Sequence, residues 1–136
     1  MTAPVFVLLS MGVIDIGNAI SEKFDMTSWA RSGAEYGLTH SGDIQGVRQV
    51  VYQTSGRDET NLTVDVAVLC ECDYQQGVVC DIACATGDQP RRYIRVAVSS
   101  MYNPLFLPKP DKPETDKYTF FQELTLLGAT VTLRIE

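Results

Sequence analysis

The first part of the chain is almost uninterruptedly apolar. Residues 3–14, APVFVLLSMGVI, contain one hydroxyl group and no charge. A transmembrane helix needs about 20 such residues, so this run has the length of part of one. Its flanks do not match a secretory signal peptide, which needs basic residues before the run and a small-residue cleavage site after it. Two interpretations stay open, part of a membrane helix or a buried core helix.

A helical period continues beyond this run, with apolar and small residues at spacings of three and four. This stripe consists of Ile16, Ile20, Phe24, Thr27, Ala30, Ala34 and Leu38. Polar residues occupy the opposite side, namely Asp15, Asn18, Glu22 and Asp25. Pro4 fits the first turn of a helix. The pattern predicts one helix over about residues 4–38, the second half of which packs on a sheet through its stripe.

Such a helix would be about 50 Å long, whereas a compact domain of this size is only about 35 to 40 Å across. The helix must therefore protrude, and water does not tolerate an apolar stalk unless a membrane or other subunits cover it. We expect residues 1–20 to form this stalk and residues 21–136 to form a single head domain. The candidate membrane and assembly residues are Val5, Phe6, Leu8, Leu9, Val13, Ile14, Asp15 and Ile16.

Three side chains of the helix call for separate interpretation. Trp29 and Tyr36 lie on the polar side, where they could contact a neighbouring subunit. Alternatively, the sheet or a loop wraps around the helix and buries them. Asp15 alone at lipid depth would cost about 2.5 to 3.5 kcal/mol, so we expect it to find a partner in an assembled bundle. On this hypothesis, Asp15→Leu leaves the head folded and impairs assembly.

Downstream, the pattern predicts a short helix and then strands. Asp43 is the expected N-cap of a helix through about Tyr52. The period then changes from 3.6 to 2, which indicates strands with one face in the core over residues 62–72, 92–99 and 129–136. Residues 107–117, rich in proline and charge, favour an extended loop. The order predicts an α+β fold, with the long N-terminal helix and the short helix packed on a small antiparallel sheet.

Cysteine spacing is the strongest chemical signal. Cys70, Cys72, Cys80 and Cys84 form C-x-C and C-x₃-C pairs around a polar turn at residues 73–77. Zinc knuckles usually have two-residue gaps, so two disulfides are favoured over a zinc site or free thiols. Because a bond between Cys70 and Cys72 would close a strained ring, both bonds should cross the hairpin. We expect the nested pairs Cys72 with Cys80 and Cys70 with Cys84. Disulfides persist outside the reducing cytosol.

Charge and motifs argue against several functions. Seventeen acidic and eleven basic residues give a net charge of −6, which disfavours nucleic acid as a partner. His40 is the single histidine, and the sequence has no phosphate-binding, dinucleotide, zinc-protease or calcium-loop motif. We therefore expect no enzymatic activity, cofactor, metal or small-molecule substrate. Arg91, Arg92 and Arg95 form either a docking patch for an acidic neighbour or a solvated strand end.

Three stretches of the chain together resemble a known family. They are residues 3–17 with the helix behind them through Tyr36, residues 70–84 followed by 92–106, and residues 129–136. They resemble the TadE/TadG-like proteins of bacterial tight-adherence (Tad) pilus systems, which are minor pilins or pseudopilins of a type IV pilus branch. Family members have a basic segment and a Glu-Phe pair ahead of the apolar run, where a peptidase cuts. Here Met1 stands almost directly before the run, so either an upstream piece is missing or the chain is not processed, and no processing residue is assigned.

The resemblance implies a membrane-inserted helix that becomes part of a filament and carries a small α+β head. It implies a location in the bacterial inner membrane with a periplasmic head, or in an extracellular pilus. The implied partners are other pilin or pilus-assembly subunits and the inner membrane, and the implied role is in pilus assembly and surface adhesion.

A second interpretation comes from a different class of protein. It is a secreted or periplasmic disulfide-stabilised binding domain with no filament role, whose first helix belongs to the core. The two interpretations differ in the place of residues 3–14. They are exposed in the first and enclosed by their own chain in the second.

Overall fold

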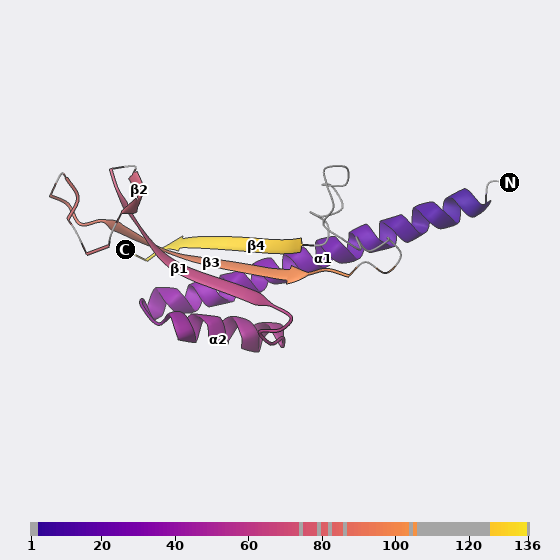
Figure 1. Cartoon of the computed structure of the whole chain (residues 1–136), viewed down its shortest axis with the longest axis horizontal. Helices are drawn as coiled ribbons and strands as arrows, with labels where there is room; N and C mark the ends of the chain where they lie inside the picture. The colour runs from indigo at the N-terminus through magenta and orange to yellow at the C-terminus, as the bar shows by residue number, and fades with distance from the viewer. Residues whose placement is uncertain are drawn as a thin grey trace.

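The computed structural model describes residues 3–73, 75–78, 80–81, 83–85, 87–103, 105 and 126–135. Its elements are α1 (Ala3–Thr39), α2 (Ile44–Ser55), β1 (Thr63–Cys72), β2 (Gln75–Val78), β3 (Arg91–Met101) and β4 (Leu126–Arg134). In the described part of the chain the strands form one antiparallel sheet in the order β2-β1-β3-β4. Both helices lie on one face of this sheet (Figure 1). The predicted α+β fold is confirmed, and the predicted loop at 107–117 lies outside the described residues.

The sheet buries one face against the helices, as the alternating sequence pattern predicted. Val66 of β1 pairs with Val96 of β3, which in turn pairs with Val131 of β4. Val66 and Val96 are buried and Val131 packs against the core. Helix residues Met26, Val47 and Val51 complete this core. β3 ends after the predicted strand and β4 begins before it, because pairing between them continues to Met101 and Leu126.

α2 begins and ends at residues that act as caps. The carboxylate of Asp43 accepts a hydrogen bond of 2.9 Å from the Gly46 N–H, which satisfies one of the amide groups left free at a helix start. Gly56 ends the helix with a φ of 64°, a left-handed conformation that glycine adopts without strain. Its N–H donates to the Tyr52 carbonyl at 3.0 Å. The predicted N-cap is confirmed, and the helix continues past Tyr52.

α1 packs on the head through small residues. Its buried positions are Asp15, Ala19, Met26, Ala30, Gly33, Ala34 and Gly37. A Cβ atom on Gly33 would lie 2.5 Å from Cγ2 of Val51, and a Cβ atom on Gly37 would collide with the side chain of Ile94. The two glycines therefore allow the backbone of α1 to approach α2 and β3 closely.

The stripe predicted for α1 is wrong at its large apolar positions. Ala30 and Ala34 are buried as expected, but the large apolar members of the stripe are exposed. These are Ile16, Ile20, Phe24 and Leu38. Asp15 and Glu22, assigned to the opposite side, face the head instead. Periodicity alone favours large apolar residues, whereas close packing between a sheet and a second helix selects small ones.

The disulfides are present, but the predicted pairs were wrong. Cys70 is bonded to Cys80, and Cys72 is bonded to Cys84. The reason is the position of the turn. β2 already begins at Gln75 opposite Cys72, and a bulge after Cys70 places Val78 opposite Cys70. The chain leaving β2 therefore brings Cys80 to Cys70, and the loop that follows brings Cys84 to Cys72.

Peptide mapping checks this pairing. Cleavage of the denatured, unreduced chain after Glu and Asp cuts behind Glu71, Asp73 and Asp81, so the four cysteines fall on separate peptides. Mass spectrometry is expected to find the peptide ending at Glu71 linked to the one ending at Asp81. A peptide that joins Cys72 to Cys80 would contradict the structure.

The close approach of α1 predicts opposite responses at two glycines. Gly33→Leu should destabilise the head by about 1 to 3 kcal/mol, because the new side chain must displace Val51. Gly17→Leu is the matched control, since a Cβ atom there would meet nothing within 4 Å. It should leave stability unchanged or raise it by up to about 1 kcal/mol through helix propensity. Urea unfolding in mild detergent, followed by Trp29 fluorescence, measures both, and equal midpoints would refute the packing.

Candidate functional site

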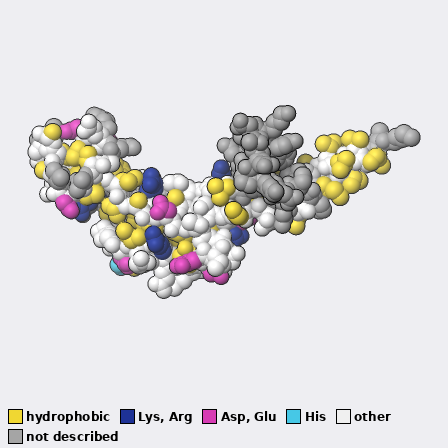
Figure 2. All heavy atoms as spheres, viewed as in Figure 1, with side chains coloured by type: hydrophobic (Ala, Val, Ile, Leu, Met, Phe, Trp, Pro, Cys, Tyr) yellow, Lys and Arg dark blue, Asp and Glu magenta, His cyan; other side chains and the backbone are white. Residues whose placement is uncertain are grey.

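The candidate functional surface is the apolar end of α1, which extends beyond the sheet (Figure 1). No residue of the described segment 3–14 is buried. The apolar residues assigned to membrane and assembly contacts are each at least half exposed: Val5, Phe6, Leu8, Leu9, Val13, Ile14 and Ile16. Figure 2 shows an apolar surface along this projecting end.

The length and composition of α1 are sufficient to cross a membrane. A core helix of a soluble protein can meet the same criterion, but such a helix is mostly buried. Here only 11% of the most apolar 18-residue stretch is buried. The alternative of a first helix enclosed by its own chain therefore does not describe this segment.

The apolar face of α1 continues along the head. Ile20 and Phe24 are 52% and 71% exposed, although Ala19 and Met26 on the other side of the helix are buried. Over this stretch α1 thus contacts the head with one face and presents large apolar side chains on another. The surface extends from Val5 to Phe24, and we refer to it as the apolar face of α1.

Further apolar side chains lie where α1 leaves the head. Met101 ends β3 and is 82% exposed, and its partner across the strands, Leu126, is 62% exposed. Leu105 is 70% exposed and its backbone contacts α1 at Asp15. Sequence reasoning missed these residues because single apolar residues near strand ends resemble ordinary core positions. They extend the exposed apolar surface from the helix onto the head.

Asp15 does not await a partner from another subunit, which corrects the sequence interpretation. Its side chain is 1% exposed, and Oδ1 accepts a hydrogen bond of 3.0 Å from the Leu105 N–H. The hydroxyl of Tyr102 donates to the Asp15 carbonyl oxygen at 3.2 Å. Asp15 therefore ties the segment after β3 to α1 within one chain. The buried contacts of the head begin here, inside the segment 1–20 assigned to the stalk.

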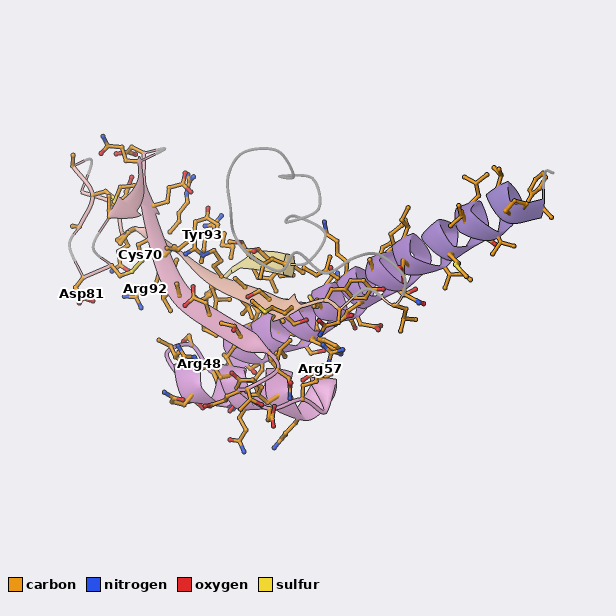
Figure 3. The ribbon with its side chains drawn as sticks, turned by 45° about the vertical axis from the view of Figure 1, so that its right-hand side comes forward. Arg48, Arg57, Cys70, Asp81, Arg92 and Tyr93 are labelled. Carbon is orange, nitrogen blue, oxygen red and sulfur yellow. A yellow bond between two sulfur atoms is a disulfide. The ribbon has the colours of Figure 1, made fainter. Side chains whose placement is uncertain are left out.

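A second polar contact lies two turns further along α1. Nη1 of Arg57 donates to Oε1 of Glu22 at 2.7 Å, and the hydroxyl of Ser100 donates to the same oxygen at 3.2 Å. The Arg57 guanidinium also lies 5.2 Å from the centre of the Trp29 ring, a favourable cation–π geometry. Figure 3 shows Arg57 beside α1. This cluster joins α1, the end of α2 and the end of β3.

Trp29 and Tyr36, the candidate subunit contacts, are partly buried by their own chain. Trp29 packs against the core and under Arg57. Tyr36 stacks on His40 with ring centres 4.3 Å apart, and its hydroxyl donates to Oδ2 of Asp43 at 3.2 Å. Burial raises the pKa of Tyr36, and the hydrogen bond and charge of Asp43 raise it further. The structure supports the alternative that the chain itself covers Trp29 and Tyr36, and the residues that cover them flank α2.

The polar groups of the described residues are the other candidates for a site. They contain no group of three His, Cys, Asp or Glu side chains placed to hold a metal ion. His40 Nδ1 lies 2.9 Å from the Thr39 hydroxyl. A polar hollow of about 650 Å³ beside Glu22 is lined by Asp58, Asn61 and Tyr102, among others. Burial raises the pKa of Tyr102, with smaller contributions from Asp15 and Glu22. We assign no catalytic residue.

No family model, curated protein or solved structure matches this chain. Its function is therefore inferred from the exposed face of α1, the contacts that fix that helix to the head, and the disulfides.

The contact of Asp15 predicts a local effect of substitution. Asp15→Leu removes the carboxylate that accepts the partly buried hydrogen bond from the Leu105 N–H, which should cost about 1 to 3 kcal/mol. Hydrogen exchange of the Leu105 amide in detergent measures the effect and should become faster. Asp25→Leu changes an exposed carboxylate of the same helix and should leave the exchange rate unchanged. Equal rates in the two variants would contradict the assigned contact.

Proposed function

We propose that this chain is a minor pilin-like or pseudopilin-like structural subunit of a Tad-type pilus. Its α1 is held in a membrane and then among the helices of neighbouring subunits, and the chain serves pilus assembly and surface adhesion. The observation that carries the proposal is the apolar face of α1. Burying each such large side chain contributes about 1.5 to 3 kcal/mol, so the whole row provides a strong drive to leave water.

The continuity of α1 supports a permanent apolar segment over a removable signal. The same helix that exposes Leu9 and Val13 supplies Met26, Ala30 and Ala34 to the core. Contacts at Asp15 and Glu22 fix its exit direction from the head. A cleaved signal peptide has no need of such a fixed connection, whereas a subunit that transmits its position from a helix to a head does.

The position of Ile20 and Phe24 supports protein partners in addition to lipid. These residues project from α1 alongside the head, on a different face from the one that packs on the sheet. In a filament, helices of neighbouring subunits would cover them. The proposed partners are therefore other pilin or pilus-assembly subunits together with the inner membrane.

The disulfides favour a compartment outside the reducing cytosol. Bonds from Cys70 and Cys72 fix the loops at the end of the head opposite the N-terminus of α1 (Figure 1). An inner-membrane protein with a periplasmic head, or a subunit of an extracellular pilus, satisfies both the apolar helix and these bonds.

Vesicle flotation tests the proposal. The wild-type chain should float with phosphatidylethanolamine and phosphatidylglycerol vesicles. Leu9→Asp should partition about 100-fold less, since a carboxylate at lipid depth costs about 2.5 to 3.5 kcal/mol. Asn18→Asp adds the same charge at an exposed polar position of α1 and should float like the wild type. A Leu9→Asp chain that still floats would refute membrane insertion.

The filament role is tested in the same samples by chemical cross-linking between chains. Phe24→Ser should keep flotation and lose cross-linked species, because the variant removes a helix contact outside the membrane segment. Unchanged cross-linking would argue for an anchored binding domain instead. Trp29 fluorescence confirms in every sample that the head is folded.

A further inference from the structure

An arginine-lined hollow lies at the end of the head opposite the N-terminus of α1. Its volume is about 470 Å³, and its lining includes Arg91, Arg92, Arg134 and Cys80. The first two arginines begin β3, and Arg134 ends β4. Pairing of these strands brings the arginines together, with a hydrogen bond of 2.8 Å from the Ile135 N–H to the Arg92 carbonyl. Figure 3 shows Arg92 beside Cys70 at this end.

The guanidinium groups of this arginine hollow are available to a partner. Arg91, Arg92 and Arg134 are all exposed. Within the described ranges, the ion pairs involve other arginines, Arg31 and Arg57. Asp81 also lines the hollow, without lying at ion-pair distance from these arginines. The disulfide from Cys80 to Cys70 holds one wall in place, so a bound acidic group would meet a preformed site.

An acidic loop lies at the other end of the same strands. Asp58 and Glu59 are exposed in the loop between α2 and β1. Hydrogen bonds of 2.7 Å from the Thr60 hydroxyl and from the Asn61 amide to Asp58 Oδ1 hold the pKa of the Asp58 carboxyl below its usual range. Arg57, the cation of this loop, turns inward to Glu22. The loop therefore presents negative charge outward.

From this placement we infer that the arginine hollow of one chain binds the Asp58 and Glu59 loop of the next copy. β1 separates the two sites by ten residues, or about 33 Å, so they lie at opposite ends of the head. The charges are complementary, and chains of net charge −6 otherwise repel one another. The hollow thus supplies a specific contact between like-charged copies.

The direction of this contact rests on the proposed function. In a filament the α1 helices of neighbouring copies run in the same direction and the copies are displaced along it, which excludes an antiparallel closed dimer of heads. A contact between two different surfaces then repeats from copy to copy and produces an open series. The repeat would follow the long axis of the sheet.

Exchange of charges between the two surfaces tests this inference. One variant carries Arg92→Glu and Arg134→Glu, and the other carries Asp58→Asn and Glu59→Arg, where asparagine keeps an acceptor oxygen for the loop. Sedimentation in mild detergent should show at least about tenfold weaker self-association for each variant alone. An equimolar mixture should associate again, because each reversed surface then meets its complement. Wild-type association should weaken between about 20 mM and 500 mM salt.

The matched control is Lys23→Glu with Arg31→Glu, which reverses two exposed cations of α1 and changes the net charge as much as the hollow variant. It should associate like the wild type. Four outcomes would overturn the inference: a wild-type chain monomeric at about 1 mM, association that stops at dimers, variants that associate normally, or a mixture that does not recover.

The readout separates this inference from the proposed function. Detergent covers α1, so sedimentation reports contacts between heads only. Failure of the charge exchange with normal vesicle flotation would reject the head contact alone. Normal charge exchange with a Leu9→Asp chain that still floats would reject membrane insertion alone. Near-UV circular dichroism establishes that each variant retains its fold.

Discussion

The structure depends on the close approach of α1 to the rest of the head. Gly33 and Gly37 leave no space for a Cβ atom against Val51 and Ile94, and Ala30 and Ala34 continue the same narrow face. Because α1 contacts the head mainly through small residues, most of its large apolar residues lie on its other faces. The apolar face of α1, from Val5 to Phe24, therefore consists of the large residues that this packing does not use. In the proposed function, membrane contact, subunit contact and core packing would use different sides of one helix.

The two ends of the head are built by different means. Near the exit of α1, polar contacts of Asp15 and Glu22 connect strands to the helix, and the adjacent surface is apolar. At the other end, two disulfides fix the loops, and the adjacent surface carries arginines. The molecule therefore has a direction, because its two ends differ in chemistry. A directional assembly requires that property of its subunit.

The sequence allowed prediction of the elements and of their layers, but not of their contacts. Strand periodicity identified the buried face of β1 and β3 because one face of that sheet is covered and the other is not. The N-cap at Asp43 was predictable since a local side-chain hydrogen bond defines it. The buried face of α1 was not, because Ile16 and Phe24 fit a stripe as well as Ala19 and Met26 do. Only the sheet and α2 together decide which side is buried.

The disulfide pairs illustrate the same limit at shorter range. The spacing of the cysteines indicated two bonds across a hairpin, and both exist. Their partners depend on a shift of register after Cys70 and on a turn that ends before Gln75. The polar residues 73–77 indicated a turn but not that it is so short, and no residue pattern indicated the shift of register. The roles of Met101, Leu105 and Arg57 likewise depend on tertiary neighbours far away in the sequence.

The buried carboxylate of Asp15 has a consequence for the depth of the molecule in a bilayer. Tyr102 and Leu105 donate hydrogen bonds to α1 at this level. Lipid chains that extended along α1 past these hydrogen bonds would surround the Asp15 carboxylate, the Asp15 carbonyl and the Leu105 N–H with hydrocarbon, which is unfavourable for polar groups. In the proposed function, Asp15 would therefore mark the level at which the lipid surface ends. Every subunit would sit at one height before it enters a fibre.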